Sequence, residues 1–440
     1  MMLSMRLRRA CAVMIMTAAR ALPGQTTGTA LAGDWAGVIR GPSSAWHVHI
    51  AVTRDSAGLR ASVDFPDANA YERPFVTTLS DSIVRFERPQ PGGTPVVLTG
   101  HVDGDTLRGT WTGFGHEAPF TAWRTPAAPL GYREEAVTFR NGDVTLAGTL
   151  FLPAIGARHR ALVCVHGSGP VDRSAYRGKA VYLARRGTAT LVYDKRGVGA
   201  STGDWTTASA NDLALDALAG VALLRAHPAI DSSRVGIEGF SQGGWIAPLA
   251  ATLSRHIAFV IVGSAAGLNP AEQSIYDVAH QMAHAGIDSA TIARATALRR
   301  RLYDSTADSL SRVSLAAELD RVHAEPWFKA SALPYPFPVT APSPGEVEFL
   351  RLEPEPIWRH VTVPVLAYWG GRDQRVPVGE SIALVRRGLA RAGNSHLTVQ
   401  VYPDADHVMA HIADPMPPGT WDFPRGVAYL QLIADWLNAR

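Results

Sequence analysis

The sequence contains very little cysteine. Only Cys11 and Cys164 occur among its 440 residues. Cys11 lies in a segment that we expect to be removed, so the mature chain would have one cysteine and no internal disulfide. Cys164 lies in the apolar stretch ALVCVHG, a setting that predicts a buried, small hydrophobic side chain. Exposure to an oxidising compartment would therefore add no covalent cross-link to this protein.

A strong net charge is also absent. The formal charge is +3, and four arginines lie in the segment expected to be removed (Arg6, Arg8, Arg9 and Arg20), which leaves 3 − 4 = −1. This balance gives no electrostatic reason to expect a nucleic-acid partner. Hydrophobic residues make up 46% and charged residues 18%, as in ordinary globular proteins. A chain of this length predicts two or three domains with ample cores.

The N-terminal segment has no apolar run long enough to span a membrane. Its start is basic, a short apolar run follows over residues 10–19, and small residues come next. This layout is typical of a secretory signal peptide. We therefore predict that residues 1–28 are a signal peptide and that the protein is secreted or periplasmic, without stable membrane insertion. A disordered cytoplasmic tail is the alternative.

Residues 29–125 lack any helical period. Short alternating runs (WHVHIAV, LRASVDF, SIVRFER, VVLTGHV, TLRGTWTG and FTAWR) are separated by turn residues such as Asp103-Gly104-Asp105. This pattern predicts a small antiparallel β domain, either a sandwich or a barrel. Its histidines are scattered without metal-ligand spacing, so the sequence predicts no metal site there. They are His47, His49, His101 and His116.

From residue 126 onward the pattern changes to continuous apolar runs that alternate with helical stretches. This favours an α/β fold whose mostly parallel sheet is buried on both faces by helices. The alternation stops over residues 267–356, where helical and proline-rich segments predict a cap inserted over the sheet. The core would then comprise residues 126–266 and 357–440.

The predicted cap lies where it could enclose a pocket above the sheet. We expect its large apolar side chains to line such a pocket or, alternatively, to pack the cap onto the sheet. They are Trp327, Phe328, Tyr335 and Phe337.

The sequence Gly239-Phe240-Ser241-Gln242-Gly243 follows an apolar strand and precedes a helical stretch. In this strand–turn–helix context, G-x-S-x-G is a nucleophile elbow. Because the turn is tight, we expect strained dihedrals at Ser241 and no room for side chains at Gly239 and Gly243. The helix N-terminus would direct its free N–H groups at the reacting centre. Ser241 is therefore the predicted nucleophile.

A serine hydroxyl needs a neighbouring base that is itself held by an acid. Asp373 follows the strand VLAYWG and His407 follows the strand VQVYP. Both would lie at the carboxyl edge of the sheet with Ser241, and they follow it in the order Ser, Asp, His. We predict the catalytic triad Ser241, Asp373 and His407. Nearby alternatives are Asp404 and Asp406 as the acid, and His411 as the base.

The loop His166-Gly167-Ser168-Gly169 directly follows another strand of this sheet. A tetrahedral intermediate needs two N–H donors directed at its oxygen. We predict an oxyanion hole made by the backbone N–H groups of Gln242 and Ser168, with Gly169 as the alternative to Ser168. The charged residues at 172–173 and 194–196 are predicted to form ion pairs that brace neighbouring loops, and direct participation in the chemistry is the alternative.

The motifs HGSGPVDR, YDKRGVGAS, GFSQGG, GGRDQRVP and DADH lie between about residue 134 and the end of the chain. Together they resemble the α/β-hydrolase superfamily, and in particular bacterial esterases close to the serine-aminopeptidase and acyl-peptidase branch, some of which carry an extra N-terminal β domain. The resemblance implies hydrolysis of short-chain carboxylic esters through an acyl-enzyme, without metal or cofactor. The substrate would be a small-molecule ester or a short peptide.

Two other functions remain open at this point. An aminopeptidase or acyl-peptidase would bind a charged amine or a blocked N-terminus, for which acidic cap residues are available. These are Glu346, Glu348, Glu353 and Glu355. A catalytically inert binding protein is disfavoured by the presence of all three triad residues, and a haloalkane dehalogenase would need aspartate at position 241. The sequence predicts no oligomeric state.

Overall fold

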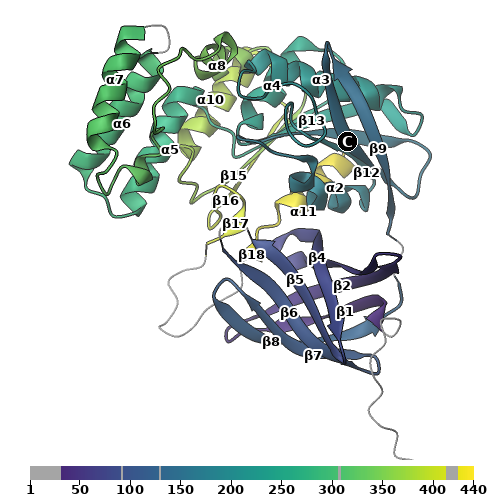
Figure 1. The fold of residues 1–440 in the computed structure, drawn as a ribbon. Helices are drawn as coiled ribbons and strands as arrows, with labels where there is room; N and C mark the ends of the chain where they lie inside the picture. The colour runs from purple at the N-terminus through teal and green to yellow at the C-terminus, as the bar shows by residue number, and fades with distance from the viewer. Residues whose placement is uncertain (1–30, 91–92, 128–129, 306–308, 413–424) are drawn as a thin grey trace, which may run out of the picture.

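The computed structural model describes residues 31–90, 93–127, 130–305, 309–412 and 425–440, and consists of a barrel below a larger α/β domain (Figure 1). The predicted signal peptide lies outside the described residues, so it stays a prediction. The expected fold class is confirmed: an all-β domain precedes an α/β-hydrolase fold.

The N-terminal strands form a closed antiparallel barrel in which each strand pairs with the next. β1 pairs with both β2 and β8, so the sheet closes on itself and has no free edge. Large apolar side chains, among them Trp35, Phe86 and Trp111, fill the interior. The strands are β1 (Gly33–Arg40), β2 (Ala45–Asp55), β3 (Gly58–Phe65), β4 (Ala70–Ser80), β5 (Ile83–Gln90), β6 (Gly93–Asp103), β7 (Thr106–Gly113) and β8 (His116–Thr125).

Two of these strands, β1 and β4, have no counterpart among the runs expected from the sequence. β1 (GDWAGVIR) carries two glycines, and β4 (AYERPFVTTLS) carries Pro74 and two charged residues. These residues break the alternation by which a strand is recognised. Pairing with neighbouring strands on both sides compensates for the weak local preference.

The central sheet of the α/β domain has the strand order β16-β15-β14-β13-β11-β12-β10-β9. The pairs from β16 to β12 are parallel, and β10 and β9 form the expected antiparallel hairpin at the edge. The strands are β9 (Tyr132–Asn141), β10 (Val144–Pro153), β11 (His159–Val165), β12 (Thr188–Tyr193), β13 (Ile230–Phe240), β14 (Val260–Gly263), β15 (Val365–Gly370) and β16 (Leu397–Tyr402).

Helices cover both faces of this sheet. α3 (Ala210–Ala226), α4 (Gly243–Leu253) and α10 (Val378–Arg391) bury one face, while α2 (Arg177–Ala184) and α11 (Tyr429–Asn438) bury the other. Val163 packs on the first face and its neighbours Leu162 and Cys164 on the second, which explains the continuous apolar run of β11. Buried Cys164 behaves as predicted. The last helix begins at Tyr429, after a short strand β18 (Arg425–Gly426) that pairs with β17 (Ala410–His411).

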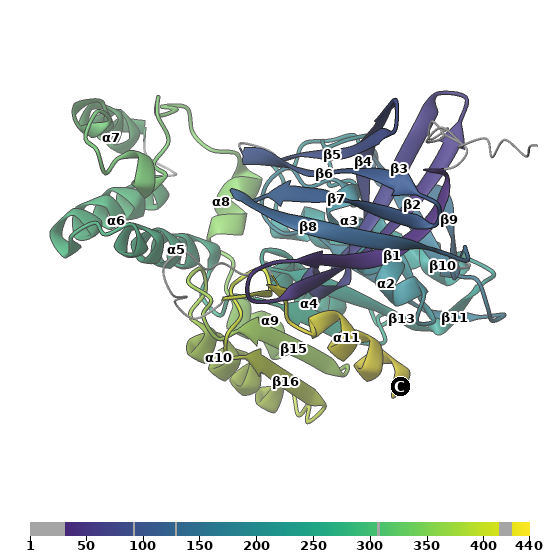
Figure 2. The same cartoon turned by 90° about the horizontal axis from the view of Figure 1, so that it is seen from below.

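The inserted segment begins with helices that project to one side of the α/β domain, at the left of both views (Figure 1, Figure 2). Its first three helices pack around a separate apolar core that contains Met282, Leu298 and Leu319. The cap elements are α5 (Pro270–His284), α6 (Ser289–Asp304), α7 (Ser309–Val322), η4 (Lys329–Ser331), α8 (Pro344–Leu350) and α9 (Pro354–Trp358).

Candidate active site

Ser241 lies in the sharp turn between β13 and α4. Its φ is +54°, the strained conformation expected of an elbow. A Cβ on Gly239 would lie 1.8 Å from the carbonyl oxygen of Gly243, and one on Gly243 would lie 2.7 Å from that of Val165. Both glycines are therefore required by contact with the backbone, as the spacing of the motif predicts.

A chain of hydrogen bonds links the three residues of the predicted triad. Nε2 of His407 lies 3.0 Å from Oγ of Ser241, and Nδ1 of His407 lies 2.8 Å from Oδ2 of Asp373. The Asp373 carboxylate is completely buried. Its other oxygen accepts the backbone N–H groups of Arg375 (2.8 Å) and Val376 (3.2 Å), which fix its orientation. This arrangement can accept a proton from Ser241 and stabilise the resulting imidazolium.

The alternative acids and base have other roles in this structure. Asp404 pairs with Arg372 at 3.1 Å on the surface. Oδ1 of Asp406 accepts the backbone N–H groups of Val408 and Ala410, so it shapes the loop that carries His407. His411 is exposed in β17.

Ser264 was not identified from the sequence. It is fully buried at the end of β14, and its Oγ donates a 2.8 Å hydrogen bond to the carbonyl oxygen of His407. Ser264 therefore fixes the backbone of the predicted base. The sequence offered one indication of this role: Ser264 lies near the end of the apolar run AFVIVGSA, at the same carboxyl edge of the sheet as Ser241.

The loop after β11 and the elbow bring Ser168 and Gln242 to the same pocket as Ser241. The N–H of Gly167 is already used, because it donates to the Tyr176 hydroxyl at 2.9 Å. Within the described residues, no hydrogen bond occupies the N–H groups of Ser168 and Gln242. These N–H groups, like that of the alternative Gly169, are therefore available to an oxyanion, and the role predicted for them stays a prediction.

Lys195, buried in the loop after β12, joins the two sides of this predicted oxyanion hole. Its Nζ donates to the carbonyl oxygens of Gly167 (2.7 Å) and Gly169 (3.0 Å) and to Oε1 of Gln242 (2.9 Å). Burial lowers the pKa of Lys195 to about 8, since the interior disfavours its charge. The expected loop-bracing role of residues 194–196 thus includes contacts with the site itself.

Of the charged residues that were predicted to brace loops, Arg173, Asp194 and Arg196 form ion pairs, whereas Asp172 and Lys195 form none within the described residues. Arg173 makes a bidentate contact with Asp194, at 3.0 and 2.8 Å. His166 is buried, and its Nε2 lies 2.5 Å from the carbonyl oxygen of Tyr193. Burial lowers the pKa of His166 to about 4. His166 is therefore a neutral structural residue rather than a second base.

Ser241 and His407 open onto a pocket of about 430 Å³. Phe240, Trp245, Phe349 and Leu350 supply apolar surface, and the cap supplies polar side chains. The polar wall consists of Gln273, Ser274, Asp277 and Tyr303, together with Arg375 from the loop after β15. Arg375 Nε lies 3.3 Å from Asp277 Oδ1, so these two charges largely neutralise each other.

The large side chains that we expected from the cap do not line this pocket. Trp327 and Phe328 are buried in the cap's own core, and Phe337 packs against that core. Tyr335 stacks on His323 at 4.0 Å between ring centroids. The expectation that they form the pocket wall is therefore wrong, and so is the alternative that they pack the cap onto the sheet, because their contacts lie within the cap itself.

Within the described residues, no group of three or more His, Cys, Asp or Glu side chains is arranged to hold a metal ion. The same residues include no helix that is both long and apolar enough to cross a membrane.

Comparison with known proteins places the chain in a family. The alpha/beta hydrolase family matches residues 162–417, which is more than half of the chain, and the chain therefore belongs to it. Among curated proteins, it is 24% identical over 305 residues to Esterase EstD of Thermotoga maritima, and 34% identical over 133 residues to the polyketide transferase ATR5 of Stachybotrys chlorohalonatus. These alignments cover 67% and 29% of this chain, but only 65% and 43% of the relatives' own lengths.

Solved structures of esterases are also similar. The Pyrococcus furiosus esterase Pf2001 matches with a TM-score of 0.43 and 18% identity, over 70% of this chain and 94% of that one. Est1E from Butyrivibrio proteoclasticus, with ferulic acid bound, matches with a TM-score of 0.42 and 17% identity, over 69% and 97% of the two chains. Both TM-scores are below 0.5, so the family assignment depends on the matched residues 162–417 alone.

Proposed function

We propose that the protein is a serine hydrolase that cleaves small carboxylic esters, with Ser241 as nucleophile, His407 as general base and Asp373 as the acid. The observation that supports this most is the hydrogen-bonded chain from Ser241 through His407 to buried Asp373, which opens onto a pocket of about 430 Å³. A pocket of this volume fits a small substrate.

In the proposed reaction, Oγ of Ser241 attacks the ester carbonyl carbon while Nε2 of His407 takes the hydroxyl proton. The N–H groups of Ser168 and Gln242 bind the oxyanion. The tetrahedral intermediate then collapses, the alcohol leaves with the proton from His407, and an acyl-Ser241 ester remains. Water, deprotonated by His407, attacks this ester and releases a carboxylic acid.

The structure supports ester hydrolysis better than aminopeptidase activity. None of the acidic cap residues considered for amine binding lines the pocket; these are Glu346, Glu348, Glu353 and Glu355. Asp277 is the acidic cap residue in the pocket wall, and Arg375 and Gln281 already contact it. Because Arg375 already offsets the charge of Asp277, this carboxylate attracts a substrate ammonium group less than an unpaired carboxylate would.

Turnover of aryl esters and aminoacyl anilides by the same preparation tests the proposal. Ser241→Ala should lower kcat on 4-nitrophenyl acetate by about 10⁴-fold or more, because the remaining rate comes from the oxyanion hole and binding alone. Ser233→Ala, at the exposed end of the same strand, is the matched control and should leave kcat unchanged. A folded Ser241→Ala protein with a normal rate would disprove the proposal, and faster anilide than ester cleavage would favour the peptidase alternative.

A further inference from the structure

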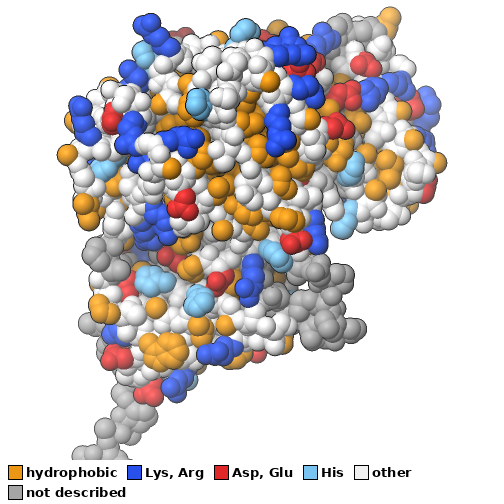
Figure 3. All heavy atoms as spheres, turned by 180° about the vertical axis from the view of Figure 1, so that it is seen from behind, with side chains coloured by type: hydrophobic (Ala, Val, Ile, Leu, Met, Phe, Trp, Pro, Cys, Tyr) orange, Lys and Arg blue, Asp and Glu red, His pale blue; other side chains and the backbone are white. Residues whose placement is uncertain are grey.

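A second cavity is larger than the pocket that contains Ser241. It has a volume of about 840 Å³ and lies where the barrel meets the α/β domain. Basic, acidic and histidine side chains gather around this junction on the molecular surface (Figure 3). The catalytic chemistry proposed above uses none of the residues that line this cavity.

The acidic groups that line the cavity already have basic side chains as partners. Glu72 on β4 accepts hydrogen bonds from Tyr132 (2.5 Å), Arg177 (2.7 Å) and Arg185 (3.0 Å). The remaining acids are paired as follows: Glu134 with Arg177, Asp64 with Arg185, and Asp34 with His49. Arg60, a further cation at the cavity, pairs with Asp55 at 2.8 Å.

Two cavity-lining arginines, Arg73 and Arg88, are left without such partners. Neither guanidinium group forms an ion pair or hydrogen bond within the part of the chain that the structure describes. Nε of Arg73 is moreover completely buried without a partner. Guanidinium groups in a partly buried site normally have acceptors, so the two groups that line the cavity are available to an anionic ligand.

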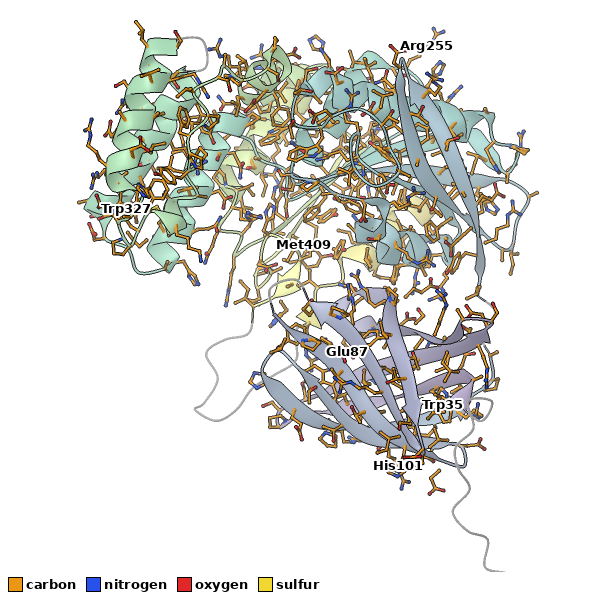
Figure 4. The ribbon with its side chains drawn as sticks, viewed as in Figure 1. Trp35, Glu87, His101, Arg255, Trp327 and Met409 are labelled. Atoms are coloured by element: carbon orange, nitrogen blue, oxygen red, sulfur yellow. The ribbon has the colours of Figure 1, made fainter. Side chains whose placement is uncertain are left out.

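The fold brings these two arginines together at one end of the barrel. Arg73 pairs across the sheet with Val63, and Arg88 with Val96, both of which are buried in the barrel interior. Directly paired residues share a face of the sheet, so both arginines start from the inner face. Glu87, the neighbour of Arg88, lies in the half of the barrel nearer the α/β domain, whereas His101 lies at the far end (Figure 4).

The electrostatics of the pair are unfavourable as long as no anion is bound. Burial lowers the pKa of Arg73, and burial together with the Arg73 charge lowers the pKa of Arg88. Tyr429 on α11 lies near Arg73, but burial raises the pKa of Tyr429, so its phenol is neutral and supplies no counter-charge. Two like charges close together in a partly buried site are costly unless an anion joins them.

The remaining lining indicates what kind of anion fits. Apart from its charged groups, it combines small polar side chains (Thr53, Ser62 and Ser174) with apolar surface from Ala61, Leu130 and the rings of Tyr71 and Tyr132. Two adjacent guanidinium groups match the geometry of a carboxylate or phosphate group. A cavity of this volume holds a molecule of drug-like size rather than a simple ion.

We propose that this cavity is a second binding site, in which Arg73 and Arg88 bind the carboxylate or phosphate group of an amphiphilic organic anion, and the apolar part of that anion lies against the tyrosine rings. The site is separate from the pocket of Ser241, so the proposal does not depend on the proposed hydrolase activity.

Isothermal titration calorimetry on the full-length chain tests this with three probes of equal chain length: octanoate, octyl phosphate and octan-1-ol. We expect saturable binding of at least one anion, at least tenfold tighter than that of the neutral alcohol. The tighter of the two anions identifies the head group that the site prefers. Absence of saturable anion binding, or equal affinity for octan-1-ol, would overturn the proposal.

Three variants locate the binding. Arg88→Gln should weaken anion binding at least tenfold, because it removes a charge-assisted contact. Arg85→Gln is the matched control on the same strand, since Arg85 is exposed, pairs with Glu87 and does not line the cavity. Arg375→Gln tests whether the probe instead occupies the Ser241 pocket. Binding that depends on Arg375 or Arg85 and not on Arg88 would overturn the proposal.

Stability provides a readout that separates a binding role from a structural one. Without a ligand, Arg88→Gln should unfold at the same or a higher temperature than the parent, because it relieves the repulsion from Arg73. A bound anion should raise the unfolding temperature of the parent but not that of Arg88→Gln. A large loss of stability in ligand-free Arg88→Gln would mean that Arg88 holds the barrel together, which would contradict the proposal.

Discussion

Lys195 offers the sharpest test of how the predicted oxyanion hole is held. It bonds to Gly167, Gly169 and Gln242, so one ammonium group connects the two chain segments that carry the proposed oxyanion donors. In Lys195→Met the side chain keeps similar bulk but donates no hydrogen bond. The two segments then lose their common anchor, and the Ser168 N–H should no longer be held toward the oxyanion.

The expected decrease in kcat follows from what a single oxyanion-hole hydrogen bond contributes to catalysis. Loss of one oxyanion-hole hydrogen bond lowers kcat by about 10²–10³-fold. We expect about 10²-fold for Lys195→Met on 4-nitrophenyl acetate, with little change in KM, because the contact acts on the transition state. Lys329→Met, which alters an exposed cap lysine, is the control and should leave kcat unchanged.

The pH dependence gives a second, independent readout. The pKa of Lys195 is about 8, and the neutral amine formed above it has two N–H groups for three acceptors. The kcat of the parent should therefore fall as the pH rises above about 8, and Lys195→Met should lack this alkaline decline. A kcat of Lys195→Met within threefold of the parent, or an unchanged alkaline decline, would refute the reasoning.

Deprotonation of Lys195 should affect the free energy of unfolding in the opposite direction to kcat: the free energy of unfolding should rise where kcat falls. In the unfolded chain the pKa of Lys195 returns to the ordinary value of a lysine, 10.5. Between pH 8 and 10.5 the unfolded state therefore binds more protons than the folded state, so the contribution of Lys195 to the free energy of unfolding rises with pH. The shift corresponds to about 3 kcal/mol over the whole window, measured as the parent minus Lys195→Met by urea unfolding.

Three further predictions concern the acid, the domain interface and the pocket. Asp373→Asn should lower kcat by about 10⁴-fold, since an amide fixes the wrong tautomer of His407, while Asp404→Asn and Asp406→Asn should cost far less; a larger loss in Asp406→Asn would show that the acid is misassigned. Glu72→Ala should lower the free energy of unfolding by about 2–3 kcal/mol, because it leaves Tyr132, Arg177 and Arg185 without their shared acceptor. Glu134→Ala, at the more exposed end of the same Arg177 contact, should cost less than about 1 kcal/mol. Equal urea midpoints for the two variants would argue against a central role for Glu72. Phe349→Ala should change the ratio of kcat/KM between octanoate and acetate esters, by an amount equivalent to about 1–3 kcal/mol. Trp327→Ala should destabilise the cap and leave that ratio unchanged. The opposite pattern would mean that the cap core controls selectivity.

The sequence was sufficient to predict the elbow because its geometry is local. Gly239 and Gly243 contact backbone atoms only a few residues away or on the adjoining strand, so their spacing already specifies the turn. Asp373 and His407 could also be placed, because each directly follows an apolar strand and the carboxyl ends of parallel strands meet at one edge. Their mutual hydrogen bonds follow from that common edge.

The role of Lys195 could not be predicted, because it depends on the order of strands in the sheet. β11 lies between β12 and β13, so the loop after β12 reaches past the loop after β11 toward the elbow. Hydrophobic patterns give the strands but not this neighbour order. Hydrophobic patterns likewise do not show which residues form the wall of the Ser241 pocket. They do not reveal that Trp327 packs in the cap's own core.

Closure of the barrel depends on information that local sequence patterns do not contain. Closure depends on the pairing of β1 with β8, which joins residues about 90 positions apart, for example Trp35 with Arg124. A sandwich and a barrel share the same alternation, and only this register distinguishes them. Closure also explains why Arg73 and Arg88 converge on one cavity. Each arginine occupies an inward-facing position because it pairs with a buried residue, Val63 for Arg73 and Val96 for Arg88. In the sequence, Arg88 ends the expected run SIVRFER and Arg73 lies in none of the expected strands, so their convergence and their lack of acidic partners become visible only in the folded structure.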